Sequence, residues 1–177
     1  MGCDIHLHVE IKRISSDSDE QWHHVSFRGE FSSRIYGMFA ALANVRNSYG
    51  IVPLEIRGLP EDISWGTFTE LYKRVKPEIS ESEEEYYYKT DQVERWVNNG
   101  YSLVCEKAGA MWCSDPDAHS FNWCTPKEMK DAFYKVFINE SGNYTGSYAE
   151  WLGLAGYMLA LEATKEYECR AVYWFDN

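Results

Sequence analysis

The sequence predicts an α+β fold, in which a small, mostly antiparallel sheet of an N-terminal hairpin and a C-terminal strand is packed by several helices. Residues 4–13 alternate between apolar and polar side chains, which is typical of a half-buried strand. Several later segments repeat apolar residues at helical spacing. Strands and helices also follow one another without the βαβ rhythm of a doubly wound sheet. A chain of 177 residues has a usual length for one domain, so we expect 1–177 to form a single domain.

The N-terminal half is expected to open with a hairpin. The polar residues Ser15 to Glu20 connect the first strand to a second run of strand-forming residues. Short helices then alternate with a stretch that carries two prolines and two glycines. The elements expected in this half are strands at 4–13 and 21–27, helices at 34–45 and 67–75, and irregular structure at 51–66.

The C-terminal half contains the clearest local signal of the chain. Thr125, Pro126 and Glu128 form a capping box with proline at the first helical position, and apolar residues follow at helical spacing as far as Phe137. The nearly continuous apolar run at 171–175 predicts a strand covered on both faces. The other elements expected here are helices at 90–98 and 147–165, strands at 101–105 and 168–175, and an acidic, tyrosine-rich insertion or lid at 79–89.

The composition limits the classes of partner. Lys and Arg number 17 against 28 Asp and Glu, so the net charge is −11, which repels phosphate backbones and anionic membranes. Duplex nucleic acid is therefore disfavoured unless a metal or a local basic patch reverses the field, and the charge alone also serves solubility. The five cysteines include no C-x-x-C pair, and no segment approaches 18 apolar residues. We expect a cytoplasmic protein without membrane contact.

The first candidate site lies on the polar face of the opening strand, which carries Asp4, His6 and His8. Same-face neighbours on a strand lie ~7 Å apart, and metal–ligand bonds are only about 2 Å long. Two neighbours can converge on one ion, but three on a straight strand cannot. A metal site would therefore need further ligands, such as His119 and Asp176. The alternative is an ordinary solvated face.

A second group of candidates lies in the connections. His119 and Ser120, in a segment expected to be a loop before the capped helix, are a candidate base or ligand and its polar neighbour. Arginines near Gly-rich backbone can hold a carboxylate or phosphate, although an ion pair that stiffens a loop is an equally good interpretation. The candidate anion-binding residues are Arg46, Asn47, Arg57, Asp62 and Ser120. The candidate ligands of an alternative structural zinc site, whose spacing is irregular, are Cys105, Cys113, His119 and Cys124.

Several separated blocks of the chain resemble one family. The blocks are Met1-Gly2-Cys3-Asp4-Ile5-His6, Arg34 with Tyr36 and Phe39, Ala43–Asn47, Arg57–Pro60 with Asp62 and Ser64, His119-Ser120, and Trp174–Asn177. They resemble a family of uncharacterised small proteins encoded by phages and prophages. The resemblance implies a phage protein in the cytosol of a host cell, and it carries over no reaction and no catalytic residues.

Two hypotheses of different classes follow. In the first, a polar pocket binds a small anionic, phosphate-containing ligand and acts as a metal-dependent hydrolase, with Asp4, His6 and His119 as catalytic residues. Its divalent metal, zinc or manganese/magnesium, would be held by Asp4, His6, His119 and Asp176. In the second, an acidic phage protein, of an anti-defence or nucleic-acid-mimic type, binds a basic host defence protein and inhibits it. The contact residues would be Glu83, Glu84, Glu85, Tyr86 and Tyr87.

Overall fold

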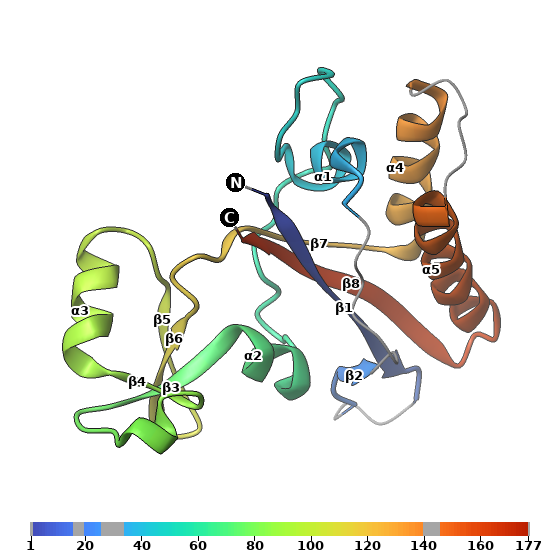
Figure 1. Cartoon of the computed structure of the whole chain (residues 1–177). Helices are drawn as coiled ribbons and strands as arrows, with labels where there is room; N and C mark the ends of the chain where they lie inside the picture. Colours follow the sequence, from blue (N-terminus) through green and yellow to red (C-terminus); the bar gives the residue numbers. More distant parts are fainter. Residues whose placement is uncertain (1, 16–19, 26–33, 140–145, 177) are drawn as a thin grey trace.

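The structure, a computed structural model, describes residues 2–15, 20–25, 34–139 and 146–176. Within these ranges the chain forms five α-helices and two four-stranded sheets (Figure 1). The predicted α+β class is confirmed, but the chain builds a second sheet that the sequence pattern did not indicate. No helix in the described ranges is long and apolar enough to cross a membrane. Most of the predicted connection at 15–20 and the end of the predicted strand at 21–27 lie outside the described residues.

The large sheet has the strand order β2-β1-β8-β7, and all its neighbours are antiparallel. Strand β1 pairs with β8 along its whole length, from Asp4 opposite Asp176 to Arg13 opposite Tyr167. The predicted N-terminal hairpin and C-terminal strand are therefore both present, and they are neighbours. The bounds are β1 Asp4–Arg13, β2 His23–Val25, β7 His119–Cys124 and β8 Tyr167–Asp176.

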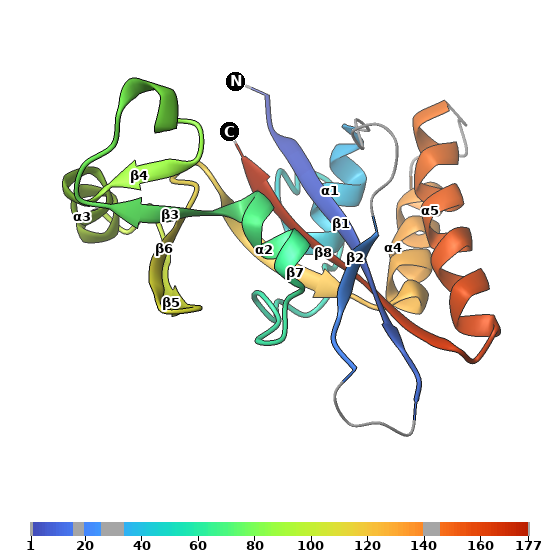
Figure 2. The ribbon, with the colours of Figure 1, turned by 90° about the horizontal axis from the view of Figure 1, so that it is seen from below.

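The apolar face of the large sheet packs against three helices, α1 (Tyr36–Ala43), α4 (Pro126–Asn139) and α5 (Gly146–Ala163) (Figures 1 and 2). Buried side chains of these three helices and of β1, β7 and β8 form one core, which includes Val9, Phe39, Phe133, Trp151 and Tyr173. This burial follows from the period-two pattern of β1, because alternate side chains of a strand point to the same face.

Helix α4 begins where the sequence predicts. The Thr125 hydroxyl accepts a hydrogen bond from the Glu128 amide at 3.3 Å, and a carboxylate oxygen of Glu128 accepts one from the Thr125 amide at 2.9 Å. These bonds satisfy backbone donors that the first helical turn leaves without partners. The capping box is therefore confirmed.

The polar face of the large sheet is partly covered by α2 (Trp65–Leu71) on the other side (Figure 2). A second apolar cluster joins Phe68, Leu71 and Tyr72 to Trp174 of β8. Residues of β8 from Arg170 to Phe175 are all buried, which confirms a strand that is covered on both faces.

The small sheet has the strand order β4-β3-β6-β5, with β3 and β4 parallel and the other pairs antiparallel. The prediction of one helix over 67–75 is wrong beyond Leu71, because Tyr72 turns to an extended backbone and pairs with Ser114 of β6. The segment expected to be an insertion at 79–89 contains a 3-10 turn and strand β4. The bounds are β3 Tyr72–Lys76, η1 Glu81–Glu83, β4 Tyr87–Lys89, α3 Thr90–Asn98, β5 Val104–Lys107 and β6 Ala110–Ser114.

Candidate functional site at the end of the large sheet

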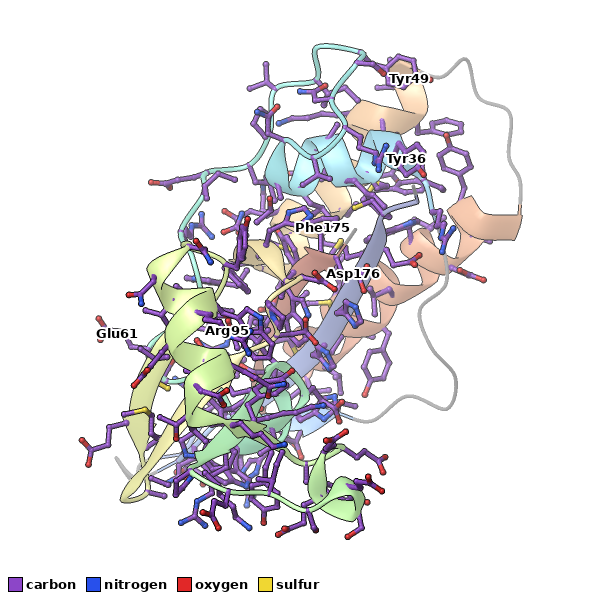
Figure 3. All side chains as sticks on the ribbon, turned by 60° about the vertical axis from the view of Figure 1, so that its left-hand side comes forward. Tyr36, Tyr49, Glu61, Arg95, Phe175 and Asp176 are labelled. Carbon is purple, nitrogen blue, oxygen red and sulfur yellow. The ribbon has the colours of Figure 1, made fainter. Side chains whose placement is uncertain are left out.

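Three strand termini meet at one end of the large sheet. Because β8 runs antiparallel to both neighbours, it ends where β1 and β7 begin, with Asp4 opposite Asp176 and His119 opposite Phe175. Figure 3 shows Phe175 and Asp176 at this end of the molecule, below the helix that carries Tyr36. We call the polar residues that contact one another here the sheet-end cluster: Asp4, His6, Arg34 and Asp176.

His6 and Asp176 form an accessible hydrogen-bonded pair at the centre of the cluster. His6 Nε2 lies 2.9 Å from Asp176 Oδ2, and the two side chains keep 45% and 37% of their surface accessible. The other carboxylate oxygen of Asp176 accepts a hydrogen bond from the Asp4 amide at 3.2 Å. The imidazole also stacks on Trp174, with ring centroids 5.5 Å apart and planes within 7°. The hydrogen bond to Asp176 and the stacking on Trp174 together fix the orientation of the His6 ring.

The electrostatics keep Asp176 ionised. Partial burial raises the pKa of this carboxyl, but the hydrogen bond and charge of His6, with the backbone amides of Asp4 and Asp176, outweigh that influence and hold the pKa below its ordinary value. A carboxylate held against an imidazole selects the tautomer that carries its proton on the facing nitrogen. The second ring nitrogen, Nδ1, makes no hydrogen bond to any residue that the structure describes.

A guanidinium lies next to this pair. Arg34 donates from Nε to Asp4 Oδ1 and from Nη2 to Asp4 Oδ2, the second bond being 2.6 Å long. This fork-shaped contact raises the pKa of Arg34, with a further contribution from the charge of Asp176. Both side chains are about half exposed, so the positive charge stands at the surface, where Asp4 holds it.

Arg46 approaches the same end from the turn after α1. It hydrogen-bonds the buried thiol of Cys3, and it lies over the ring of Tyr36 at 5.4 Å. Burial raises the pKa of Cys3, Arg46 opposes that rise, and the charges of Asp176 and Asp4 add to it. The Cys3 thiol therefore stays protonated, and Arg46 contributes a second positive charge to this end of the sheet.

His119 and Ser120 lie in strand β7, and the prediction of a loop here is wrong. His119 Nδ1 is 2.9 Å from Ser120 Oγ, and its ring lies against Phe175 with centroids 6.2 Å apart. Ser120 has a positive φ of 53°, and the β7–β8 register shifts between His119 and Asn122. A β-bulge of this kind re-aims side chains at strand ends and often lies beside functional sites. His119 Nε2 is buried and has no hydrogen-bond partner among the described residues.

The residues predicted to bind a metal do not assemble into a ligand set in the described ranges, where no group of three or more His, Cys, Asp or Glu side chains could hold an ion. Asp4 is paired with Arg34, and His6 is paired with Asp176. The same finding applies to the alternative zinc set. Within that set, Cys124 is fully buried, and burial raises the pKa of its thiol.

Three of the predicted anion-binding residues bind protein groups. Arg57 donates to both carboxylate oxygens of Glu128, with Nη1 at 3.0 Å, and it stacks over Trp123. Asn47 bonds the backbone N–H and C=O of Ile51. These contacts match the loop-stiffening interpretation that the sequence left open. Arg57 also holds the pKa of Glu128 at about 2 through its hydrogen bonds and charge, against the opposing effect of burial.

The third, Asp62, belongs to a buried ion network that sequence reasoning missed. Glu10 is fully buried and accepts from Arg170 Nε at 2.7 Å and from the Ser64 amide at 2.8 Å. Arg170 also donates to Asp62 at 2.6 Å, and Trp22 donates to the same carboxylate at 2.8 Å. This network ties the segment before α2 to the middle of β1 and β8. The available signal was an arginine at position 170 inside an otherwise apolar strand.

Two further site residues carried no sequence signal of their role. Trp174 lies between two imidazoles, because His8 stacks on it at 4.7 Å on the side away from His6. Arg34 pairs with Asp4 across 30 positions of sequence, and nothing in the local pattern names that partner. His8 Nδ1 in turn lies 3.3 Å from His24 Nε2.

A surface hollow lies elsewhere, on the β5–β6 hairpin. Its volume is about 450 Å³. Its lining contains one carboxylate and no imidazole or cation, so it offers fewer groups for catalysis or anion binding than the sheet-end cluster does. The lining residues are Val104, Cys105, Glu106, Gly109, Ala110 and Met111.

Comparison with known proteins adds no relative, because no protein family, curated protein or solved structure matches the chain. The resemblance to phage proteins therefore stays a prediction. The function has to be argued from the cluster itself.

Proposed function

We propose that the sheet-end cluster binds a small anionic, phosphate-containing ligand and hydrolyses it, with His6 as the general base. The observation that carries the proposal is the accessible His6–Asp176 pair at 2.9 Å. A base whose far side is held by a carboxylate, with a cation close by, is the arrangement that hydrolytic sites share.

The chemistry assigns one task to each group. Asp176 accepts a hydrogen bond from His6 Nε2–H, which leaves His6 Nδ1 to take a proton from a water molecule. The water oxygen then attacks the phosphorus, and the bond to the leaving oxygen breaks. The imidazolium, stabilised by Asp176, returns its proton to the leaving oxygen.

Arg34 is suited to hold the phosphate. Its bonds to Asp4 use Nε and Nη2, so the Nη1 hydrogens have no partner among the described residues. A guanidinium in this position can donate to a phosphate oxygen while Asp4 fixes its plane. Arg46 adds positive charge from the other side of β1.

A divalent metal, as the sequence predicts, would be a further Lewis acid at this site. The described residues do not form a three-ligand set, so we derive no step through a metal. The predicted role of His119 as a base or ligand is kept as a separate proposal, because its β7 position pairs with the core residue Phe175 and not with His6.

The test is hydrolysis of phosphomonoesters and phosphodiesters by the purified protein, with Mg²⁺, Mn²⁺, Zn²⁺ or a chelator added. The proposal predicts activity that falls at least about 100-fold in His6→Gln, in the range usual for loss of a general base. His23→Gln, an exposed histidine on β2, is the matched control and should keep full activity. Equal activity of the two variants would overturn the assignment of His6.

A second candidate function keeps the acidic segment as a contact for a basic host defence protein. Glu84, Glu85 and Tyr86 are exposed, Tyr86 to 63%, which favours an outward-facing patch. Glu83 and Tyr87 are less free, because Lys76 contacts both of them. A partner captured from host lysate should be lost when Glu84 and Glu85 are both replaced by Lys, and equal capture by the reversed protein would refute this contact surface.

A further inference from the structure

The small sheet has one face that differs in charge from the rest of the molecule. Helix α3 covers the opposite face (Figure 1). There, Trp96 packs edge-on against Tyr88, with ring centroids 4.9 Å apart. Tyr88 is the β4 partner of Val75, so the alternate residues of β3 point away from α3. We call the face away from α3 the cationic face. It carries Arg74, Lys76, Tyr87, Lys89, Lys107 and Trp112.

Four cations gather on this face of a chain with a net charge of −11. Only Lys76 has a carboxylate within ion-pair distance among the described residues, namely Glu83 at 2.9 Å. Arg74 is exposed, and neither it nor Lys89 or Lys107 forms an ion pair with any described residue. Such a local concentration weakens the repulsion that the net charge exerts on an anion near this face.

Aromatic rings are interleaved with these cations. Arg74 lies between Tyr87 of β4 and Trp112 of β6 in the register of the sheet. Trp65 of α2 packs edge-on against Trp112 at 5.4 Å and remains 50% exposed. The Lys107 ammonium lies 5.9 Å from the Trp65 ring. The face thus presents both positive charge and an exposed aromatic ring.

We propose that the cationic face binds single-stranded nucleic acid. Phosphates would lie against Arg74, Lys89 and Lys107, and a base would stack on Trp65. Binding of single strands combines a cationic groove with aromatic platforms, and it tolerates any sequence because every base has a flat face. The four strands span about 14 Å, so the site covers only a few nucleotides.

The contacts favour this ligand over other anions. An acidic peptide would find the same cations but would gain nothing from the exposed Trp65 ring, and a duplex hides the faces of its bases. Glu83 acts on this face as an internal counter-charge, since it occupies Lys76. Removing its charge with Glu83→Gln should therefore strengthen binding.

The test is fluorescence anisotropy of a labelled oligothymidylate of about 10 nucleotides. Three cations without an ion pair among the described residues predict a log–log salt slope of about −2, so affinity should fall about 20-fold between about 50 and 200 mM NaCl. The double variant Arg74→Gln/Lys89→Gln should reduce that slope to about −0.7 and bind at least about ten-fold more weakly at low salt. Trp65→Ala should weaken binding with no change in slope.

A matched control separates this face from the rest of the molecule. Arg95→Gln removes an exposed cation from α3, on the covered side, and should leave binding unchanged. Absence of binding at low salt, or equal binding by the Arg74/Lys89 double variant, would overturn the proposal. Equal affinity for a duplex would also overturn the proposal. The same holds if polyglutamate displaces the oligonucleotide completely and Trp65→Ala binds the oligonucleotide as tightly as wild type.

Discussion

Mild acid should destabilise the fold through His8. Burial, followed by the charges of His24 and His6, lowers the pKa of this imidazole to about 3. The unfolded chain takes up a proton near its ordinary value of about 6.5, whereas the folded chain does not. Stability is therefore complete above about pH 6.5 and is lost as pH falls below it, toward the folded pKa.

The loss of stability near pH 5.5 depends little on the exact pKa of His8 in the folded chain. One pH unit below about 6.5, protonation stabilises the unfolded state by RT ln 11, or about 1.4 kcal/mol, whereas at about pH 7.5 it contributes less than about 0.1 kcal/mol. His8→Gln removes this titration. Wild type should lose about 1.4 kcal/mol more than this variant over the interval.

Urea unfolding followed by tryptophan fluorescence measures both proteins at both pH values. His8→Gln also loses the stack on Trp174, so its stability at high pH will be lower, but only the change with pH tests the reasoning. His23→Gln, which removes an exposed imidazole from the same region, should behave as wild type. If His8→Gln shows the same loss on acidification as wild type, His8 does not resist protonation and the argument is refuted.

Two further predictions concern the supports of the site. Glu10→Gln should lower the free energy of unfolding by about 3–5 kcal/mol in urea denaturation, because it leaves the buried Arg170 charge without its main counter-charge. An unchanged unfolding midpoint would show that this pair is dispensable. Gly66→Ala should destabilise by about 1–3 kcal/mol, because the added methyl would lie 2.7 Å from His24 Cβ. Gly153→Ala, which meets open space on α5, should be neutral or stabilising, and equal melting temperatures for the two variants would contradict the packing of α2 on β2.

The sequence pattern predicted those helices and strands that are determined by residues close together in the chain. The alternation of 4–13 and the capping box at Thr125 each act within one element, and both are present as expected. The helix expected over 67–75 ends early because Tyr72 to Lys76 gain strand partners in β6 and β4. Those partners lie more than ten residues away, and strand β4 has only three residues, too few for a period to be visible.

The candidate site likewise contains residues that the sequence could identify and residues that it could not. The pairing of His6 with Asp176 follows from a polar strand face beside a terminal strand, and both residues could be named from sequence. The loop expected at His119 is a bulged strand because Asn122 to Cys124 pair with β8, a long-range contact that polar local composition conceals. The role of Arg34 in the site could not be predicted, because its two hydrogen bonds to Asp4 depend on how α1 packs against β1. Its role becomes visible only in three dimensions.

The central claim is that His6, held by Asp176, faces a bound phosphate group. The most direct measurement is a titration of the protein with inorganic phosphate at neutral pH, followed by the imidazole NMR signals of the histidines. The account predicts that the His6 signals shift to saturation while those of the exposed His23 do not move, and that Arg34→Gln and Asp176→Asn each weaken the response. His6 signals that stay in place, or that move only in parallel with His23, would contradict it.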